Sequence, residues 1–183
     1  MRIISGKYRG RTLQGPRGVE LRPTGDRLKE TLFNILGSRT GGSVFMDVFA
    51  GTGSIGIEAL SRGAGDVLFI ENSPEAVRLI QKNLHRCGIQ SCYRLIDQDA
   101  FAALRHLGRQ QFSAGIIFFD PPYRFTPYED LLDITFGMKI ASGDAICIIE
   151  HHAKAEVPQS GENYKCFRMV KQGDKRLSFF ECR

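Results

Sequence analysis

From residue 44 to residue 150, short apolar runs alternate with segments whose apolar residues recur at helical spacing. Runs that are apolar at nearly every position are typical of strands buried on both faces, and their alternation with helices predicts a parallel sheet. Two further runs flank Gly173 and Asp174, a pair that favours a hairpin and therefore an antiparallel addition. The seven expected strands span residues 44–50, 67–70, 93–96, 116–119, 145–150, 165–170 and 177–182.

The segments between these strands carry helix signals. Thr24 is an expected N-cap and Gly37 an expected stop for a helix that precedes the sheet. Ser73 followed by Pro74 predicts the start of another helix. Residues 2–13 predict a short N-terminal β-hairpin, which an irregular connection joins to the first helix.

This order of elements predicts a Rossmann-like α/β fold, a mostly parallel sheet with helices on both faces. A chain of 183 residues suffices for one domain with a substantial core. We therefore expect a single domain over residues 1–183. Within it, residues 1–23 form a basic hairpin or arm, and residues 24–183 form the helix and the α/β core.

The composition favours a soluble globular protein, with 42% hydrophobic and 25% charged residues. No apolar stretch approaches the roughly 20 residues of a membrane span, and the N-terminus lacks the apolar core of a signal peptide. The five cysteines have no paired short spacing, which favours thiols in a reducing compartment over disulfides or a zinc site. The histidines show no metal-ligand spacing either. We expect a cytoplasmic monomer that uses neither metal nor membrane.

The positive charge is concentrated near the N-terminus. Residues 1–40 hold nine Lys or Arg and three Asp or Glu, whereas the rest of the chain holds sixteen and seventeen. A local excess of cations is typical of a surface that binds a polyanion such as nucleic acid, although a solvated arm is the alternative. The expected RNA-binding cations are Arg2, Lys7, Arg9, Arg11, Arg22 and Arg27.

A glycine-rich loop follows the first expected strand. Gly51, Gly53 and Gly56 fit G-x-G-x-x-G between a strand and a helix, the context that a nucleotide-type cofactor site requires. The first two glycines allow a tight turn and close approach of a ligand, and Gly56 allows the helix to pack near the sheet. Glu71 ends the next strand, where a carboxylate can accept both hydroxyls of a ribose.

Two further acids help to choose the cofactor. Asp47 precedes the glycines and would repel a pyrophosphate, whereas it pairs well with the ammonium of a methionine moiety. Asp99 follows the third strand, where it can either contact an adenine amine or cap the helix that begins at Ala100. Asp97 is the competing choice for the adenine contact.

The turn Asp120-Pro121-Pro122-Tyr123 follows the buried fourth strand. Open α/β sheets bind ligands at the carboxyl ends of such strands. The two prolines stiffen the turn and remove two backbone donors, so that nearby carbonyl groups keep free acceptors. A carboxylate, a free carbonyl and a flat ring suit a planar base with an exocyclic amine.

These motifs resemble a known family. The glycine loop at 47–53, Glu71 and the turn at 120–123 look like the motifs of class I S-adenosylmethionine-dependent amino-methyltransferases. The strings at 2–11, 22–34 and 58–64 narrow the resemblance, which covers nearly the whole chain, to the RsmD family.

The resemblance implies methyl transfer from S-adenosylmethionine to the N2 amine of one guanine in bacterial 16S ribosomal RNA. The substrate is the small ribosomal subunit or its assembly intermediate. The amine would donate to the Asp120 carboxylate and the Pro121 carbonyl, and the guanine would stack on Tyr123 after extrusion. Pro122 completes the catalytic set. The implied cofactor residues are Asp47, Phe49, Ala50, Gly51, Gly53, Glu71, Asn72, Asp99 and Ala100.

Other functions stay open at the level of sequence. The Asp-Pro-Pro-Tyr turn also serves adenine-N6 and cytosine-N4 methylation of DNA, and related loops serve glutamine methylation. A nicotinamide-dependent oxidoreductase would need a hydride-handling site and a substrate domain, and neither is visible. A non-catalytic RNA-binding module with the same fold is the third class, because fold alone does not decide function.

Overall fold

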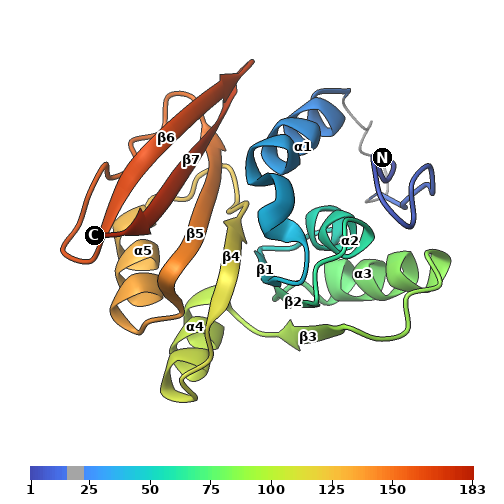
Figure 1. Ribbon diagram of the computed structural model, residues 1–183, viewed down its shortest axis with the longest axis horizontal. Helices are drawn as coiled ribbons and strands as arrows, with labels where there is room; N and C mark the ends of the chain where they lie inside the picture. Colours follow the sequence, from blue (N-terminus) through green and yellow to red (C-terminus); the bar gives the residue numbers. More distant parts are fainter. Residues whose placement is uncertain (16–22) are drawn as a thin grey trace.

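The computed structural model describes residues 1–15 and 23–183, and its centre is one seven-stranded sheet (Figure 1). The strands lie in the order β3-β2-β1-β4-β5-β7-β6, parallel from β3 to β5, with β7 antiparallel to both β5 and β6. The strands are β1 (Val44–Val48), β2 (Asp66–Glu71), β3 (Tyr93–Asp97), β4 (Ala114–Phe119), β5 (Ala141–His152), β6 (Tyr164–Gln172) and β7 (Lys175–Cys182).

Helices cover both faces of the sheet, as predicted. The clusters of buried residues place α1, α2 and α3 on one face and α4 and α5 on the other. The helices are α1 (Pro23–Leu36), α2 (Ser54–Ser61), α3 (Pro74–Arg86), α4 (Ala100–Arg109) and α5 (Tyr128–Gly137), and the 3₁₀ turn η1 (Gly37–Thr40) links α1 to β1. No helix in the described part of the chain is both long and apolar enough to cross a membrane.

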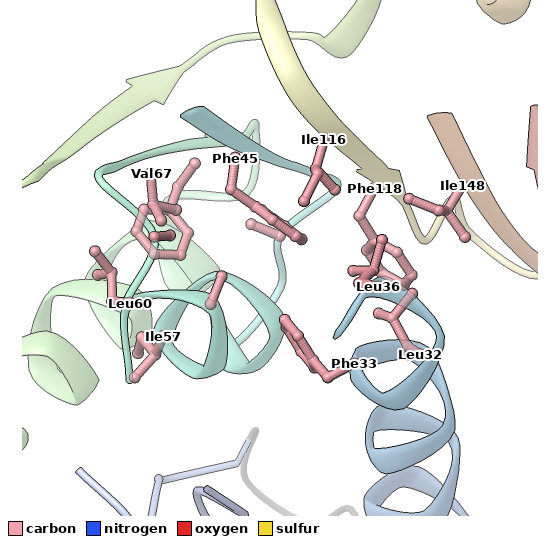
Figure 2. Packing of buried hydrophobic residues seen from close by; sticks show 14 of the residues in the cluster. Leu32, Phe33, Leu36, Phe45, Ile57, Leu60, Val67, Ile116, Phe118 and Ile148 are labelled. Carbon is pink, nitrogen blue, oxygen red and sulfur yellow. The ribbon is translucent and has the colours of Figure 1, made fainter. Parts of the chain in front are cut away.

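Alternate residues of the central strands enter opposite cores. Phe45 of β1 packs with Leu32 and Phe33 of α1 on one face (Figure 2), whereas its neighbour Met46 packs with residues of α4 and α5 on the other. Since side chains alternate along a strand, a strand buried on both faces must be apolar throughout. This explains why apolar runs, and not alternating patterns, identified these strands.

The connectivity creates a crevice at the carboxyl edge of the sheet. The chain runs from β1 to β2 and β3 on one side, then returns to β4 on the other side of β1. Loops that leave β1 and β4 therefore diverge, which is the switch point where open α/β sheets bind ligands.

Several predicted boundaries shift by a few residues. The helix α1 begins at Pro23, so Thr24 lies within its first turn and is not the N-cap. Ser73 does cap α3 with Pro74 at the first helical position, and Gly37, at φ 53°, ends α1. The strand β5 extends beyond its predicted apolar run at both ends because β4 and β7 supply partners there.

The N-terminal segment is paired more loosely than the predicted hairpin. Its antiparallel pairing is a single bridge between Arg2 and Thr12, supported by a bond from Ile3 N to Arg11 O (3.0 Å). Other backbone donors of the segment bind α2 instead and are not available for a longer ladder. These bonds are Ile4 N and Ser5 N to Glu58, Lys7 N to Ser61 O, and Tyr8 N to Ser61 Oγ.

Candidate active site

The loop after β1 makes a tight left-handed turn. Gly51 and Gly53 have φ of 55° and 73°, a region that glycine enters without steric cost, and Gly53 directly precedes α2. Phe49 also has a positive φ, 61°, and its ring packs edge-on against Phe125 at 5.5 Å. The backbone therefore turns sharply over the end of β1, as the two glycines predicted.

Gly56 lets α2 lie directly on β2. A β-carbon at this position would stand 2.3 Å from Cε1 of Phe69 and 2.9 Å from Cγ1 of Val67. Those side chains belong to the buried core and cannot move aside without opening it. The expected packing role of Gly56 is confirmed.

Asp47 is buried beneath the loop, where its Oδ2 accepts a hydrogen bond from Gly56 N at 2.8 Å. Desolvation raises the pKa of Asp47 well above the ordinary carboxyl range despite that bond, and the carboxylates of Asp120 and Glu71 raise it further. Neighbouring carboxylates thus repel the ionised form of Asp47 at this edge of the sheet, and a positively charged ligand would relieve that repulsion.

Glu71 lies at the end of β2 and organises the surrounding backbone. Its Oε2 accepts from Gly51 N at 2.8 Å, and its Oε1 accepts from Asn72 N at 3.0 Å and Ser73 N at 2.9 Å. A carboxylate offers about four lone-pair sites, so acceptor capacity remains for a ligand hydroxyl. Ribose binding by Glu71 stays a prediction.

Asp99 caps α4. Its Oδ1 accepts a hydrogen bond from Ala102 N at 3.1 Å, which confirms the capping alternative. Asp97 lies opposite Glu71 in the β2–β3 register, and Ala100, the first residue of α4, is buried. The choice between Asp97 and Asp99 as the adenine contact stays open.

The turn after β4 presents free acceptors. Asp120 N donates to Val48 O at 3.3 Å, and Phe125 N donates to Pro122 O at 2.9 Å. No backbone N–H of the described residues donates to the Pro121 carbonyl. The Asp120 carboxylate likewise receives no hydrogen bond and forms no ion pair with residues 1–15 or 23–183. Tyr123 is 77% exposed, with its ring 5.3 Å from that of His152.

Asp120 lies between two cavities. One, of about 240 Å³, is lined by the turn, His152 and Lys175, and the other, of about 500 Å³, is lined by α1, the start of α2 and Lys175. Desolvation in the crevice, followed by repulsion from Glu150, raises the pKa of Asp120, whereas Lys175 lowers it. Because the residue as a whole is exposed to solvent, water screens these effects.

The pair Glu150–Lys175 was not found from the sequence. Glu150 is buried near the end of β5 and pairs with the ammonium of Lys175, the first residue of β7. Burial lowers the pKa of Lys175, but the carboxylates of Glu150 and Asp120 raise it on balance. The sequence did offer one indication of Glu150 as a site residue, because it is a charged residue at the end of an apolar strand. The neighbouring His151 is buried, with its Nε2 2.8 Å from Ser178 Oγ.

The expected RNA-binding cations separate into free and engaged groups. Lys7, Arg9 and Arg27 are exposed and form no ion pair within the described residues. Arg2 pairs with Asp26 at 3.7 Å. Arg11 donates to the Cys87 carbonyl at the end of α3. Arg22 lies outside the described residues.

Comparison with known proteins decides the family. The family model "Conserved hypothetical protein 95", which represents the RsmD family, matches residues 1–181. The chain belongs to this family. Ribosomal RNA small subunit methyltransferase D of Haemophilus influenzae is 39% identical over 152 residues, covering 82% of this chain and 78% of that protein. The protein of the same name from Escherichia coli K12 is 32% identical over 168 residues, covering 92% and 83%.

The fold agrees with this family. The solved structure of yhhF from Escherichia coli superposes with a TM-score of 0.85 and 31% sequence identity, covering 100% of this chain and 98% of that one. The RsmD-family member described here is therefore a methyltransferase with the class I fold, as the resemblance implied.

Proposed function

We propose that this RsmD-family protein transfers a methyl group from S-adenosylmethionine to the N2 amine of a guanine in 16S ribosomal RNA. The observation that carries the proposal is the turn after β4, where a carboxylate and a carbonyl without a hydrogen-bond partner among the described residues meet an exposed ring beside a cavity. Its relatives are named for ribosomal RNA of the small subunit. We infer the small subunit, or an intermediate in its cytoplasmic assembly, as partner.

The residues at the carboxyl edge fit S-adenosylmethionine better than a dinucleotide. The repulsion that Glu71 and Asp120 exert on ionised Asp47 would be increased by a pyrophosphate and decreased by an ammonium or a sulfonium. Asp47 would face the ammonium, Glu71 the ribose hydroxyls, and the glycine loop the methionine backbone. When bound, S-adenosylmethionine supplies a methyl group on positively charged sulfur.

The turn after β4 would orient and activate the amine. The lone pair of the guanine N2 is delocalised into the ring, so the planar amine is a poor nucleophile. Hydrogen bonds from N2 to the Asp120 carboxylate and the Pro121 carbonyl favour a pyramidal nitrogen whose lone pair points away from both acceptors. Tyr123 stacks on the extruded base. Most of the rate enhancement comes from the alignment of the amine with the methyl group and from electrostatic stabilisation of the transition state.

Labelled S-adenosylmethionine incubated with 16S ribosomal RNA, either deproteinised or in small subunits, tests the function. Nucleoside mass spectrometry should show N2-methylguanosine, and parallel incubation with duplex DNA should show no transfer. Labelled N6-methyladenosine, or label in DNA or protein alone, would contradict the proposal.

Glu71→Ala should weaken S-adenosylmethionine binding by about tenfold or more, because charged hydrogen bonds to the ribose are each worth ~1.5–3 kcal/mol. Isothermal calorimetry measures the change. The control is Glu75→Ala, which removes an exposed acid from the first turn of α3. Glu71→Gln keeps the side-chain shape and reveals how much of the loss comes from a disturbed loop. Unchanged affinity in Glu71→Ala would place the ribose elsewhere.

The pH dependence of methyl transfer should report Asp120. The ionised carboxylate is the stronger acceptor for N2, and its raised pKa means that it ionises at higher pH than an ordinary Asp. Single-turnover rates should therefore rise with pH above the usual carboxyl range. Lys175→Met should move the midpoint upward and Glu150→Gln downward, because Lys175 lowers the pKa and Glu150 raises it. Shifts of the midpoint in the opposite directions would mean that Asp120 is not the group whose ionisation controls the rate.

A further inference from the structure

The ion pair between Glu150 and Lys175 joins a buried carboxylate to an ammonium whose side chain is 41% exposed. Burying a carboxylate costs free energy that an ion pair repays only when the remaining acceptors and donors are also satisfied. Glu150 is 7% exposed, yet its second oxygen accepts no hydrogen bond within the described residues. Lys175 has no other hydrogen-bond partner there, so two of its three donors remain free.

This pair lies at the cavity beside the turn after β4, where the base is expected. Both residues line the 240 Å³ cavity together with Asp120 and Tyr123. The antiparallel pairing of β5 with β7 places Lys175 opposite His152, two residues beyond Glu150. The lining of the cavity thus includes the carboxylates of Asp120 and Glu150 and the ammonium of Lys175, together with the ring of Tyr123 and two histidines.

This order of groups matches the Watson–Crick edge of guanine. That edge presents N2–H as a donor, N1–H as a second donor, and O6 as an acceptor. Adenine presents an acceptor at N1 and a donor amine at position 6, and cytosine also places an acceptor where guanine has N1–H. A site built from two acceptors and a donor would leave its buried charges unpaired with either base.

We propose that Glu150 and Lys175 are specificity-determining residues that read the guanine, with Glu150 accepting from N1–H and Lys175 donating to O6. This inference rests on the proposed function, in which Asp120 holds the N2 amine. The ion pair stays formed during recognition, because each residue uses a group that the other leaves free.

The test compares two bases that both carry a 2-amine. Synthetic RNA is prepared with guanine or 2-aminopurine at the position mapped by mass spectrometry. The base 2-aminopurine lacks both N1–H and O6. The quantity measured is the ratio of kcat/KM for guanine to kcat/KM for 2-aminopurine. Comparing this ratio between variants cancels the intrinsic difference in reactivity of the two amines.

Glu150→Gln with Lys175→Met removes both charges together and leaves no uncompensated buried ion. In this double variant the ratio of kcat/KM for guanine to kcat/KM for 2-aminopurine should fall by about 10- to 100-fold, because only guanine offers the N1–H and O6 that the two residues would bind. The matched control is Lys165→Met with Glu181→Gln, an exposed pair at the other end of the β6–β7 ladder. The control should keep the parental ratio.

Equal losses for both bases, or an unchanged ratio, would overturn the proposal even if the parent methylates guanine. Absence of transfer by the parent would instead refute the proposed function itself. A second measurement uses the parent protein alone, so it does not depend on whether the double variant folds. If Lys175 faces position 6, 2,6-diaminopurine must be a poorer substrate than 2-aminopurine, because its 6-amine opposes the ammonium. The reverse order would also overturn the proposal.

Discussion

Asp120→Asn should depress methyl transfer by about 100-fold or more while leaving S-adenosylmethionine affinity nearly unchanged. The amide keeps the volume of the side chain, but it loses the charge and points either a weaker acceptor or a donor at the target amine. The Asp120 carboxylate makes no hydrogen bond or ion pair with the described residues, so the substitution breaks no side-chain contact of this kind there. Single-turnover rates and calorimetry measure the two effects separately.

Two variants control this experiment. Asp133→Asn removes an exposed acid from α5 and should be silent in both measurements. Asp120→Glu keeps the charge but moves it by one methylene, so a large loss of rate would show that position matters as well as charge. Near-parental turnover of Asp120→Asn under single-turnover conditions would remove this carboxylate from the mechanism.

The site was largely predictable because it depends on local sequence at strand ends. Parallel strands bring their carboxyl ends to one edge, so Asp47, Glu71 and Asp120 were expected to meet once their strands were found. The glycine turn was predictable for the same reason, since a positive φ at Gly51 and Gly53 requires that residue type. The strands were predicted from short continuous apolar runs, and the helices from apolar residues at helical spacing.

Features that depend on distant pairing could not be predicted. Lys175 reaches Glu150 only because β7 pairs antiparallel with β5, and no spacing in the sequence records that register. Glu58 looks like an ordinary exposed acid on α2, yet it is fully buried. It accepts from Ile4 N at 2.8 Å and Ser5 N at 3.0 Å, and it pairs with Arg62 at 2.8 Å.

Glu58 also explains how the basic N-terminal segment is held. Lys29 of α1 lies 3.5 Å from Glu58 and donates to Arg2 O at 2.7 Å, so one buried carboxylate connects α1, α2 and the segment. Desolvation lowers the pKa of Lys29, although Glu58 opposes that change. Gly6 approaches α2 so closely that a β-carbon would stand 1.8 Å from Ser61 O. The segment is therefore a fixed surface and not a detached arm.

Replacing Lys7, Arg9 and Arg27 together by Ala should lower the affinity for the RNA substrate by about 10- to 100-fold and reduce the salt dependence of binding by about three units of slope. These cations are exposed and form no ion pair within the described part of the chain. Arg9 and Arg27 line one surface pocket between the segment and α1. Their charge is thus free to displace counterions from RNA. Arg2 and Arg11 are left intact because both already bind other parts of the protein.

Filter binding at several salt concentrations, with S-adenosylmethionine affinity measured alongside, separates this effect from damage to the cofactor site. The matched control replaces Arg105, Arg109 and Lys139, three exposed cations on α4 and after α5, far from the N-terminal segment (Figure 1). It carries the same loss of net charge, so a general electrostatic effect would weaken both triple variants alike. If the N-terminal segment is the RNA-binding surface, only the variant at Lys7, Arg9 and Arg27 should lose affinity for RNA. Parental affinity of that variant at every salt concentration would mean that the RNA enters the crevice from another side.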